Sequence, residues 1–287
     1  MRWIAAAAIL TGAVAWSYWP TLLRLVHTWD REPDYSHGFF VIPLAVFFLW
    51  ARRDRFPGSA TGFAWPGLIV IALSVGVRIL GARWYVDAVD GWSMMLLIGG
   101  IVWLLAGYRV FLWSLPSVAF LWFMVPLPWR MERWVSLPLQ RVATQLSCWT
   151  LQCFGQPALA EGNTILIDDL HFEVEQACSG LRIFVAIFAL AFAYVILVRR
   201  TWWEKLFLLA SAIPIALIAN SARIVVTTLL GLHVSGEAAH RFTHDFAGWV
   251  MIPFAAGLFA MVLWYLGKAT REIEQVDIGT VVQQEHV

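Results

Sequence analysis

Residues 178–198 read CSGLRIFVAIFALAFAYVILV. Arg182 is the one charged side chain in this run, and a helix needs about 20 mostly apolar residues to cross a bilayer. The run therefore predicts a transmembrane helix. Similar runs recur along the chain, and together they predict about eight transmembrane helices, at roughly 3–19, 38–51, 64–81, 92–107, 110–125, 178–198, 206–232 and 246–266.

The composition of the whole chain agrees with this reading. The 287 residues are 60% hydrophobic and 14% charged, and their mean hydropathy is +0.70. Soluble domains are roughly 45–50% apolar and about 25% charged, so a soluble enzyme and a disordered chain are excluded. The net charge of +1 offers no basic surface for DNA or RNA. We expect an all-α polytopic membrane protein with the lipid bilayer as a partner and no nucleic acid.

Lysine and arginine in short loops mark the cytoplasmic side of a membrane protein. Two such clusters lie at residues 52–55 and 199–205. If the N-terminus is cytoplasmic, both clusters are cytoplasmic only when residues 131–154 do not cross the membrane. That segment is amphipathic and follows the Pro126-Leu-Pro128 break, so it predicts an outer amphipathic helix that is interfacial or re-entrant. A ninth crossing at this segment is the alternative.

Residues 163–175 read NTILIDDLHFEVE, the one strand-like stretch that we identify. Its alternation on both sides of Asp168-Asp169 predicts a small extracytoplasmic β-hairpin. We expect one transmembrane domain over residues 1–267 and a polar cytoplasmic tail over residues 268–287. The run at 3–19 resembles a signal peptide, but its continuation into Trp16 and Trp19 favours an uncleaved anchor. Cys148 and Cys153 are predicted to be packing residues.

Ionisable side chains inside membrane helices are costly and each one needs an explanation. Cys178 opens one predicted helix, where the helix dipole favours the thiolate. Ser179 follows it, and Arg182 lies four residues further on, so we expect Cys178 and Arg182 to share a helix face. Taken alone, a membrane cysteine is usually a small hydrophobic residue.

Two further groups of polar residues lie on other predicted helices. Asn220 and Arg223 are three residues apart in the run at 206–232, and the alternative for Arg223 is a structural ion pair with an outer carboxylate. His244 and Gly248 are four apart at the start of the last run, where the absent side chain of Gly248 lets a neighbour approach. Histidine suits proton transfer near neutral pH, but a lone interfacial histidine is more often structural.

The predicted topology places Cys178, Arg223 and His244 near the same outer leaflet, although they come from three helices. A cysteine with a nearby histidine is the arrangement of nucleophilic acyl transfer through a thioester. A fixed guanidinium can stabilise the thiolate or the oxyanion. Tyr35 and His37, at the outer entry of the second run, either line a substrate groove or anchor the interface.

These residues resemble the exosortase branch of the exosortase/archaeosortase membrane proteases. The resemblance rests on Glu175-Gln-Ala-Cys178-Ser-Gly-Leu-Arg182, Asn220-Ser-Ala-Arg223-Ile and His244 followed by Gly248, supported by Tyr35-Ser-His-Gly38 and Pro126-Leu-Pro128. It covers roughly residues 29–266.

The resemblance implies an eight-span cysteine protease and transpeptidase in a bacterial inner membrane, with its active site on the extracytoplasmic side. Its partners would be membrane-anchored proteins with a C-terminal sorting signal: a short Pro-Glu-Pro-like motif, a membrane helix and a basic cluster. It further implies Cys178 as nucleophile, Arg223 as its electrostatic partner and His244 as the third catalytic residue. Arg182, Asn220, Ser179 and Gly248 would support them, and Glu175 would join the substrate groove.

Two other functions stay open from the residues alone. A channel or transporter would use Arg223 and Asn220 as an anion path, but the polar residues gather at one end and no matched pair of interrupted helices is evident. A metalloenzyme would use His233, His240, His244 and Asp245, but Arg241 stands where a zincin needs its glutamate. We expect no cofactor and no metal.

Overall fold

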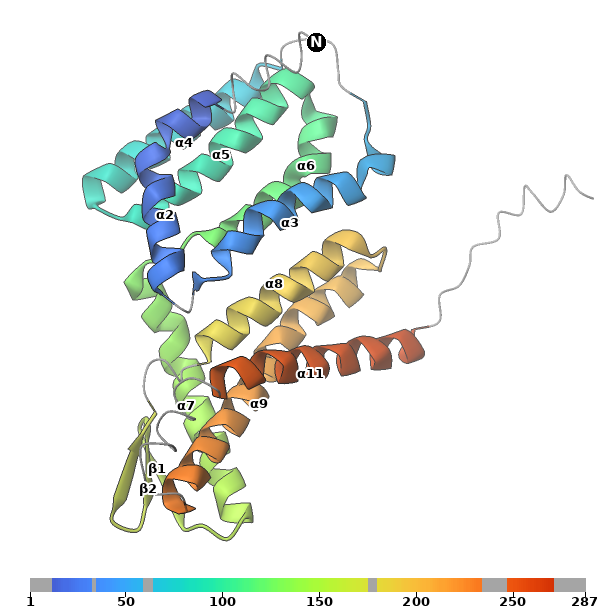
Figure 1. Cartoon of the computed structure of the whole chain (residues 1–287). Helices are drawn as coiled ribbons and strands as arrows, with labels where there is room; N and C mark the ends of the chain where they lie inside the picture. Colours follow the sequence, from blue (N-terminus) through green and yellow to red (C-terminus); the bar gives the residue numbers. More distant parts are fainter. Residues whose placement is uncertain (1–11, 33–34, 59–63, 175–179, 234–246, 271–287) are drawn as a thin grey trace, which may run out of the picture.

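The computed structural model describes residues 12–32, 35–58, 64–174, 180–233 and 247–270, and the structural statements below concern those residues. They form a helical protein with one small sheet (Figure 1). The elements in chain order are α2 (Trp19–Arg31), α3 (Gly38–Ala51), η2 (Arg53–Arg55), α4 (Pro66–Trp84), α5 (Asp87–Ala106), α6 (Tyr108–Phe120), η3 (Leu121–Met124), α7 (Trp129–Cys153), β1 (Ala158–Glu161), β2 (Thr164–Ile167), β3 (Leu170–Glu173), α8 (Leu181–Leu197), α9 (Trp202–His233) and α11 (Ala247–Ala269).

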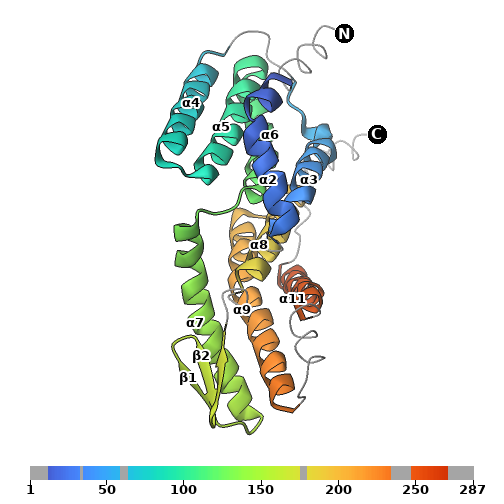
Figure 2. The same cartoon turned by 60° about the vertical axis from the view of Figure 1, so that its left-hand side comes forward.

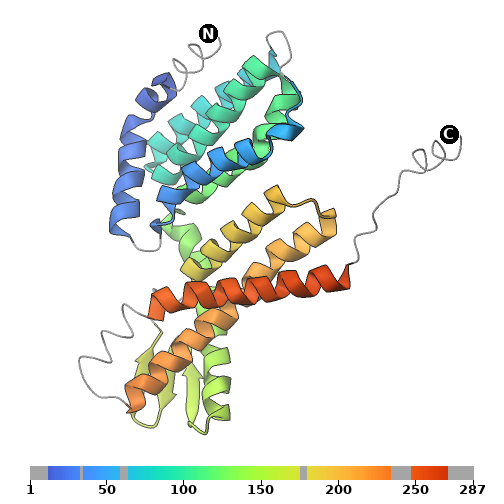
Figure 3. The ribbon, with the colours of Figure 1, turned by 45° about the vertical axis from the view of Figure 1, so that its right-hand side comes forward.

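The helices form two groups, which Figure 2 and Figure 3 show from two further directions. Helices α2, α3, α5 and α6 pack around one apolar core with α4 packed against α5, and α8, α9 and α11 pack around a second core. Helix α7 and the sheet pack along the C-terminal half of α9 in a third core. Helix α8 joins the two groups, because Ile196 lies in the first core while Ile183 and Ile187 lie in the second.

The predicted multi-pass helical architecture is confirmed, whereas the number of spans is not. Four described helices are long and apolar enough to cross a bilayer: Pro66–Trp84, Asp87–Ala106, Trp202–Leu232 and Val250–Ala269. Tyr108–Met124 and α7 together make a fifth candidate with a bend of 86°. At about 1.5 Å per residue, α3 and α8 fall short of a hydrocarbon core about 30 Å thick. Most of the first predicted span lies outside the described residues, so the count of eight remains a prediction.

The amphipathic segment after the proline pair is the helix α7. The break at Pro126 and Pro128 is where the chain turns by 86° between η3 and α7. One polar stripe of α7 faces the protein and is buried, while its exposed face carries large apolar side chains together with Arg130, Arg133 and Arg141. The buried residues are Ser136, Gln140, Ala143, Thr144, Ser147, Cys148 and Leu151. The exposed apolar residues are Trp129, Met131, Trp134, Val135, Val142 and Trp149.

The predicted hairpin is present, but it belongs to a three-stranded antiparallel sheet in the order β1-β2-β3. Strands β2 and β3 meet at the predicted Asp168-Asp169 turn, where Asp168 has φ of 50°. Strand β1 pairs with β2 from Ala158 opposite Ile167 to Glu161 opposite Thr164. The two-residue turn Gly162-Asn163, with φ of 62° at Gly162, is the sequence signal that would have predicted β1.

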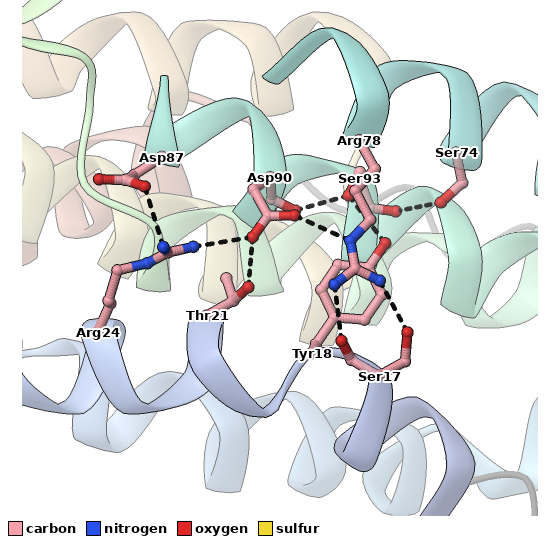
Figure 4. A network of polar contacts seen from close by, with 9 residues as sticks. All are labelled: Ser17, Tyr18, Thr21, Arg24, Ser74, Arg78, Asp87, Asp90 and Ser93. Carbon is pink, nitrogen blue, oxygen red and sulfur yellow. Dashed lines mark hydrogen bonds and ion pairs between the residues drawn. The ribbon is translucent and has the colours of Figure 1, made fainter. Parts of the chain in front are cut away.

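A polar network joins α2 to α4 and α5 (Figure 4). Asp90 on α5 accepts hydrogen bonds from Thr21 Oγ1 and from Arg24 Nη2 at 3.0 Å, and it lies 3.2 Å from Arg78 Nε. The Asp90 side chain is only 14% exposed, so this carboxylate has two guanidinium partners and little water. Buried charges are tolerated when they are paired in this way.

The same network continues along α4 and α5 (Figure 4). Tyr18 Oη lies 2.8 Å from Ser93 Oγ, and Ser74 Oγ donates to the Ser93 carbonyl oxygen at 2.7 Å. Arg78 donates to Ser17 Oγ and to the Ser17 carbonyl oxygen, and its guanidinium lies 4.2 Å from the centre of the Tyr18 ring. Polar contacts therefore fix α2 against the pair α4 and α5.

We predict that Asp90→Asn destabilises the protein, because Arg24 and Arg78 then lose their shared carboxylate. The expected loss is about 2 kcal/mol, the scale of a hydrogen bond to a charged group, seen as a drop of several degrees in the thermal unfolding midpoint of the detergent-solubilised protein. Asp87→Asn is the matched control, since Asp87 is 75% exposed and such surface pairs contribute little. Equal midpoints for the two variants would contradict the structural role of Asp90.

Candidate functional site

The motif that contains Cys178 and the motif that contains Arg223 meet where Gly180 contacts Asn220. Gly180 is two residues after Cys178 in the sequence and immediately precedes α8. A Cβ atom at Gly180 would lie 3.1 Å from both Cβ and Cγ of Asn220, so no larger residue fits there without displacing its neighbour. Asn220 is 1% exposed and lies in the middle of α9. The structure therefore brings the end of the cysteine motif against the start of the Asn220-Ser-Ala-Arg223 motif.

The start of α8 differs from the prediction. Gly180 has φ of 80° and ψ of 0°, which is a left-handed conformation, and α8 begins at Leu181. Helix α8 therefore begins three residues after Cys178, which lies outside the described residues, so the sharing of a helix face by Cys178 and Arg182 stays a prediction. Arg182 lies in the first turn of α8 and is half-buried. The cause is the glycine, which adopts a left-handed conformation at little cost and ends helical continuity.

The residue before the cysteine motif is held by a side chain that the sequence analysis did not select. Gln140 on α7 donates from Nε2 to the Val174 carbonyl oxygen, and its Oε1 accepts from Asn163 Nδ2 at 2.9 Å. The Val174 backbone N–H donates to the Asn163 carbonyl oxygen at 2.9 Å. Gln140 is buried. Its signal in the sequence is the spacing of polar residues along the amphipathic segment, which places Gln140 on one stripe with Ser136, Thr144 and Ser147.

Helix α7 also contacts the motif on α9 directly. Ser147 Oγ lies 3.3 Å from the Ser221 carbonyl oxygen, and Ser221 Oγ donates to the Ala143 carbonyl oxygen at 3.4 Å. Small residues at these positions let the two backbones approach closely, as is usual where helices pack within membranes. Arg223 follows on the next turn of α9 and is partly buried. The α7–α9 contact thus fixes the positions of Asn220 and Arg223 along α7.

The Tyr35-Ser-His-Gly38 motif also meets the chain that leads to Pro126-Leu-Pro128, and we call these two the second pair of motifs. His37 Nε2 lies 3.0 Å from the Phe123 carbonyl oxygen, and Trp29 Nε1 donates to the Met124 carbonyl oxygen at 2.8 Å. Because a carbonyl oxygen only accepts, the contact assigns a proton to Nε2 of His37. Gly38 packs against the Trp29 ring so closely that an added Cβ would overlap it. The Tyr35-Ser-His-Gly38 motif is therefore fixed to the chain just before Pro126-Leu-Pro128.

A cleft of about 1130 Å³ lies beside this second pair of motifs. Its walls come from α2, from the connection between α4 and α5, and from the chain around the α6–α7 break. They include Arg24, His27, Tyr35, Tyr85, Asp87, Pro126, Pro128 and Arg130. Tyr35 lines this cleft and His37 contacts the Phe123 carbonyl oxygen, while the substrate groove expected for the two residues stays a prediction.

Several predicted site residues lie outside the described residues. These are Glu175, Cys178, Ser179 and His244, together with His240 and Asp245 of the metalloenzyme alternative. Gly248 belongs to the first turn of α11 as described, and His233 ends α9. Within the ranges that the structure describes, no three His, Cys, Asp or Glu side chains gather as ligands for a metal ion.

The two other cysteines differ from each other. Cys148 is buried in the core between α7, the sheet and α9, as predicted for a packing residue. Cys153 is exposed, because it ends α7 and faces away from that core, so the prediction that it packs is wrong. Buried structural cysteines are inert as nucleophiles.

We predict that Gly180→Ala is more damaging than Gly155→Ala. Both glycines have φ near 80°, so alanine adds a similar backbone strain of about 1 kcal/mol at each. Alanine at Gly155 meets no atom within 4 Å, whereas at Gly180 it presses on Asn220. The thermal unfolding midpoint, followed by tryptophan fluorescence, should fall further for Gly180→Ala. A larger fall for Gly155→Ala would show that the Gly180–Asn220 contact is loose.

Comparison with known protein families gives one match. Residues 29–265 match the family profile described as transmembrane exosortase (Exosortase_EpsH). The match begins at Trp29 and includes both pairs of motifs, α7 and most of α11. Searches of curated proteins and of solved structures found no match.

Proposed function

The chain belongs to the transmembrane exosortase family, and on that premise we propose that it is an integral-membrane cysteine protease and transpeptidase. Its substrates would be membrane-anchored proteins whose C-terminal sorting tail has a short Pro-Glu-Pro-like motif, a membrane helix and a basic cluster. We place it in a bacterial inner membrane with the reaction on the extracytoplasmic side. The family match supports the general kind of function, and the specific reaction is our proposal.

The observation that carries the proposal is the contact of Gly180 with Asn220. It joins the segment that contains Cys178 to the helix that contains Arg223, although the two lie about forty positions apart in the sequence. Before Cys178, the chain is held at Val174 by Gln140, and after Cys178 it contacts Asn220 at Gly180. A described contact therefore holds the chain on each side of Cys178. Reacting groups must be positioned to within a fraction of an ångström for efficient catalysis.

In the proposed reaction, Cys178 Sγ attacks the carbonyl carbon of the scissile peptide bond. The tetrahedral oxyanion that forms is stabilised by the Arg223 guanidinium. His244, which holds the proton lost by the Cys178 thiol, delivers it to the leaving amine as the C–N bond breaks, which releases the sorting tail and leaves a thioester on Cys178. An acceptor nucleophile then attacks the thioester carbonyl, gives its proton to His244 and frees the Cys178 thiolate. The acceptor is water, an amine or a lipid, and the mass of the released protein distinguishes these three.

The supporting residues fit two roles in this scheme. Arg182, in the first turn of α8, adds positive charge near the helix N-terminus, where the helix dipole already favours an anion. Asn220 and Gly180 fix the approach of α8 to α9. Ser179 and Gly248 carry over from the family motif as neighbours of Cys178 and His244.

Cys178→Ala should abolish processing of a co-expressed reporter that has such a sorting tail, because the thioester cannot form. Immunoblotting for the shortened reporter measures the effect. Cys153→Ala is the matched control, since it removes an exposed thiol from the end of α7 and should leave processing unchanged. A Cys178→Ala protein that still shortens the reporter would refute the nucleophile. Mass spectrometry of a reporter adduct on Cys178 gives the direct evidence.

Arg223→Lys should lose most of the activity, because a lysine point charge does not replace the planar guanidinium fork. We expect a fall of roughly 10²-fold or more, the scale of a lost oxyanion donor, measured as the initial rate of reporter cleavage in membranes. Arg141→Lys on the exposed face of α7 is the matched control and should retain the wild-type rate. Full activity of Arg223→Lys would reduce Arg223 to a structural residue.

A further inference from the structure

We propose that the cleft beside the α6–α7 break binds the extracytoplasmic segment of the substrate as an extended peptide, and that Arg24 pairs with a carboxylate of that peptide. This inference rests on the proposed function and adds to it the place where the substrate is recognised. Among the described residues, Arg223 is not part of the cleft walls.

The size and walls of the cleft fit a short peptide. Its volume of about 1130 Å³ exceeds the range of about 300–1,000 Å³ that is usual for small-molecule sites. Tyr35, Tyr85 and Trp129 line it together with Pro126 and Pro128. Tyr85 is 93% exposed and Trp129 is 63% exposed, so flat aromatic faces are open to a ligand. Grooves lined with aromatic residues bind extended, proline-containing peptides in other proteins.

The backbone around the break is itself extended. Val125 has φ of −96° and ψ of 121°, and Pro128 has φ of −57° and ψ of 139°. Pro126 and Pro128 have no N–H groups, so this wall offers carbonyl acceptors and few donors. Such a wall suits the N–H groups of an extended chain that lies beside it.

Arg24 provides a positive charge in this cleft. Its guanidinium is held in place by an ion pair, and its side chain is 51% exposed. One face of its guanidinium is held by Asp90, which is largely buried in the network of Figure 4. The other partner is Asp87, which is 75% exposed and lies at a longer distance of 3.4 Å. A carboxylate on the substrate can replace Asp87 without disturbing Asp90. Guanidinium groups bind carboxylates with well-defined geometry, which provides selectivity as well as affinity.

A peptide fits the charges better than a lipid headgroup does. Arg24, His27 and Arg130 share the cleft with Glu32, Asp87 and Glu132. Charges of both signs therefore lie close together in the cleft, and a peptide has both hydrogen-bond donors and acceptors along its length to match them. Phe123, two residues before the cleft residue Val125, contacts Phe188 and Phe192 within α8.

A photo-crosslinking experiment tests where the substrate binds. A benzophenone amino acid replaces Tyr85 in the full-length Cys178→Ala protein, which is co-expressed with the tail-bearing reporter. The same probe replaces Tyr108, at the opposite end of α6 from the cleft, as the control. We expect the reporter to crosslink at Tyr85 at least about ten times more than at Tyr108, because Tyr85 lines the cleft and Tyr108 does not. Crosslinks at Tyr85 to lipid alone would overturn the proposal.

A charge experiment tests the role of Arg24 independently of protein yield. Two reporters differ only in having Glu or Gln in the short motif, and the measured quantity is the ratio of their processing rates. The wild type should favour Glu by about tenfold, the scale of a charge-assisted hydrogen bond. Arg24→Gln should reduce the ratio to about one, and Asp87→Asn should raise it, because a competing carboxylate is gone. Arg83→Gln, which alters an exposed arginine outside the cleft, should leave the ratio unchanged.

The two proposals fail in different ways. An unchanged ratio in Arg24→Gln, with intact processing, would overturn the cleft proposal and leave the cysteine mechanism standing. Reporter crosslinked at Tyr85 of the Cys178→Ala protein, combined with a wild-type protein that never shortens the reporter, would retain the cleft and overturn the proposed reaction. The crosslinking result does not depend on cleavage, so it decides the question of binding even where Arg24→Gln fails to fold.

Discussion

A side chain with hydrogen-bonding groups is costly in hydrocarbon unless it finds partners within the protein. This constraint accounts for the orientation of α7, which would otherwise be unexpected for an amphipathic helix. Its polar stripe faces α9 and the sheet, and its exposed face has tryptophan and valine. The same constraint keeps Asp90 between Arg24 and Arg78 in the first helix group. In both places, polar contacts determine the relative alignment of the helices, because apolar contacts alone are non-directional.

The sequence was sufficient where a single segment determines its own structure. The apolar runs predicted the helices α4, α5, α9 and α11 at spanning length, and Pro126 and Pro128 predicted the break before α7. Asp168-Asp169 predicted the turn between β2 and β3. It was not sufficient where a partner decides the outcome. Gly180 was predicted to be part of a helix. The sequence alone does not show its left-handed conformation, which places α8 against Asn220.

The sequence likewise did not predict which side chains of different helices and strands contact each other. Gln140 and Val174 are separated by 34 positions, and nothing in either segment indicates that they bond. Asp90 and Arg78 are charged residues near predicted helix ends, where they would usually be taken as solvated. For the candidate site, the motifs were predicted from their residue types, and the structure adds the contact between Gly180 and Asn220. That contact explains why the motif needs a glycine before the helix and a compact, buried amide in α9.

The two pairs of motifs serve the proposed function in different ways, and α8 relates them. One pair joins the segment of Cys178 to α9, and the other joins Tyr35-Ser-His-Gly38 to the chain beside the cleft. His37 donates from Nε2 to the Phe123 carbonyl oxygen, which fixes its ring against the chain before the α6–α7 break. Phe123, which His37 holds, packs against Phe188 and Phe192 on α8. Binding energy from a remote part of a substrate accelerates a reaction only when the protein between is rigid enough to convert it into alignment. The contacts of His37 with Phe123, and of Phe123 with α8, are the described connection between the Tyr35-Ser-His-Gly38 motif and the helix that follows Cys178.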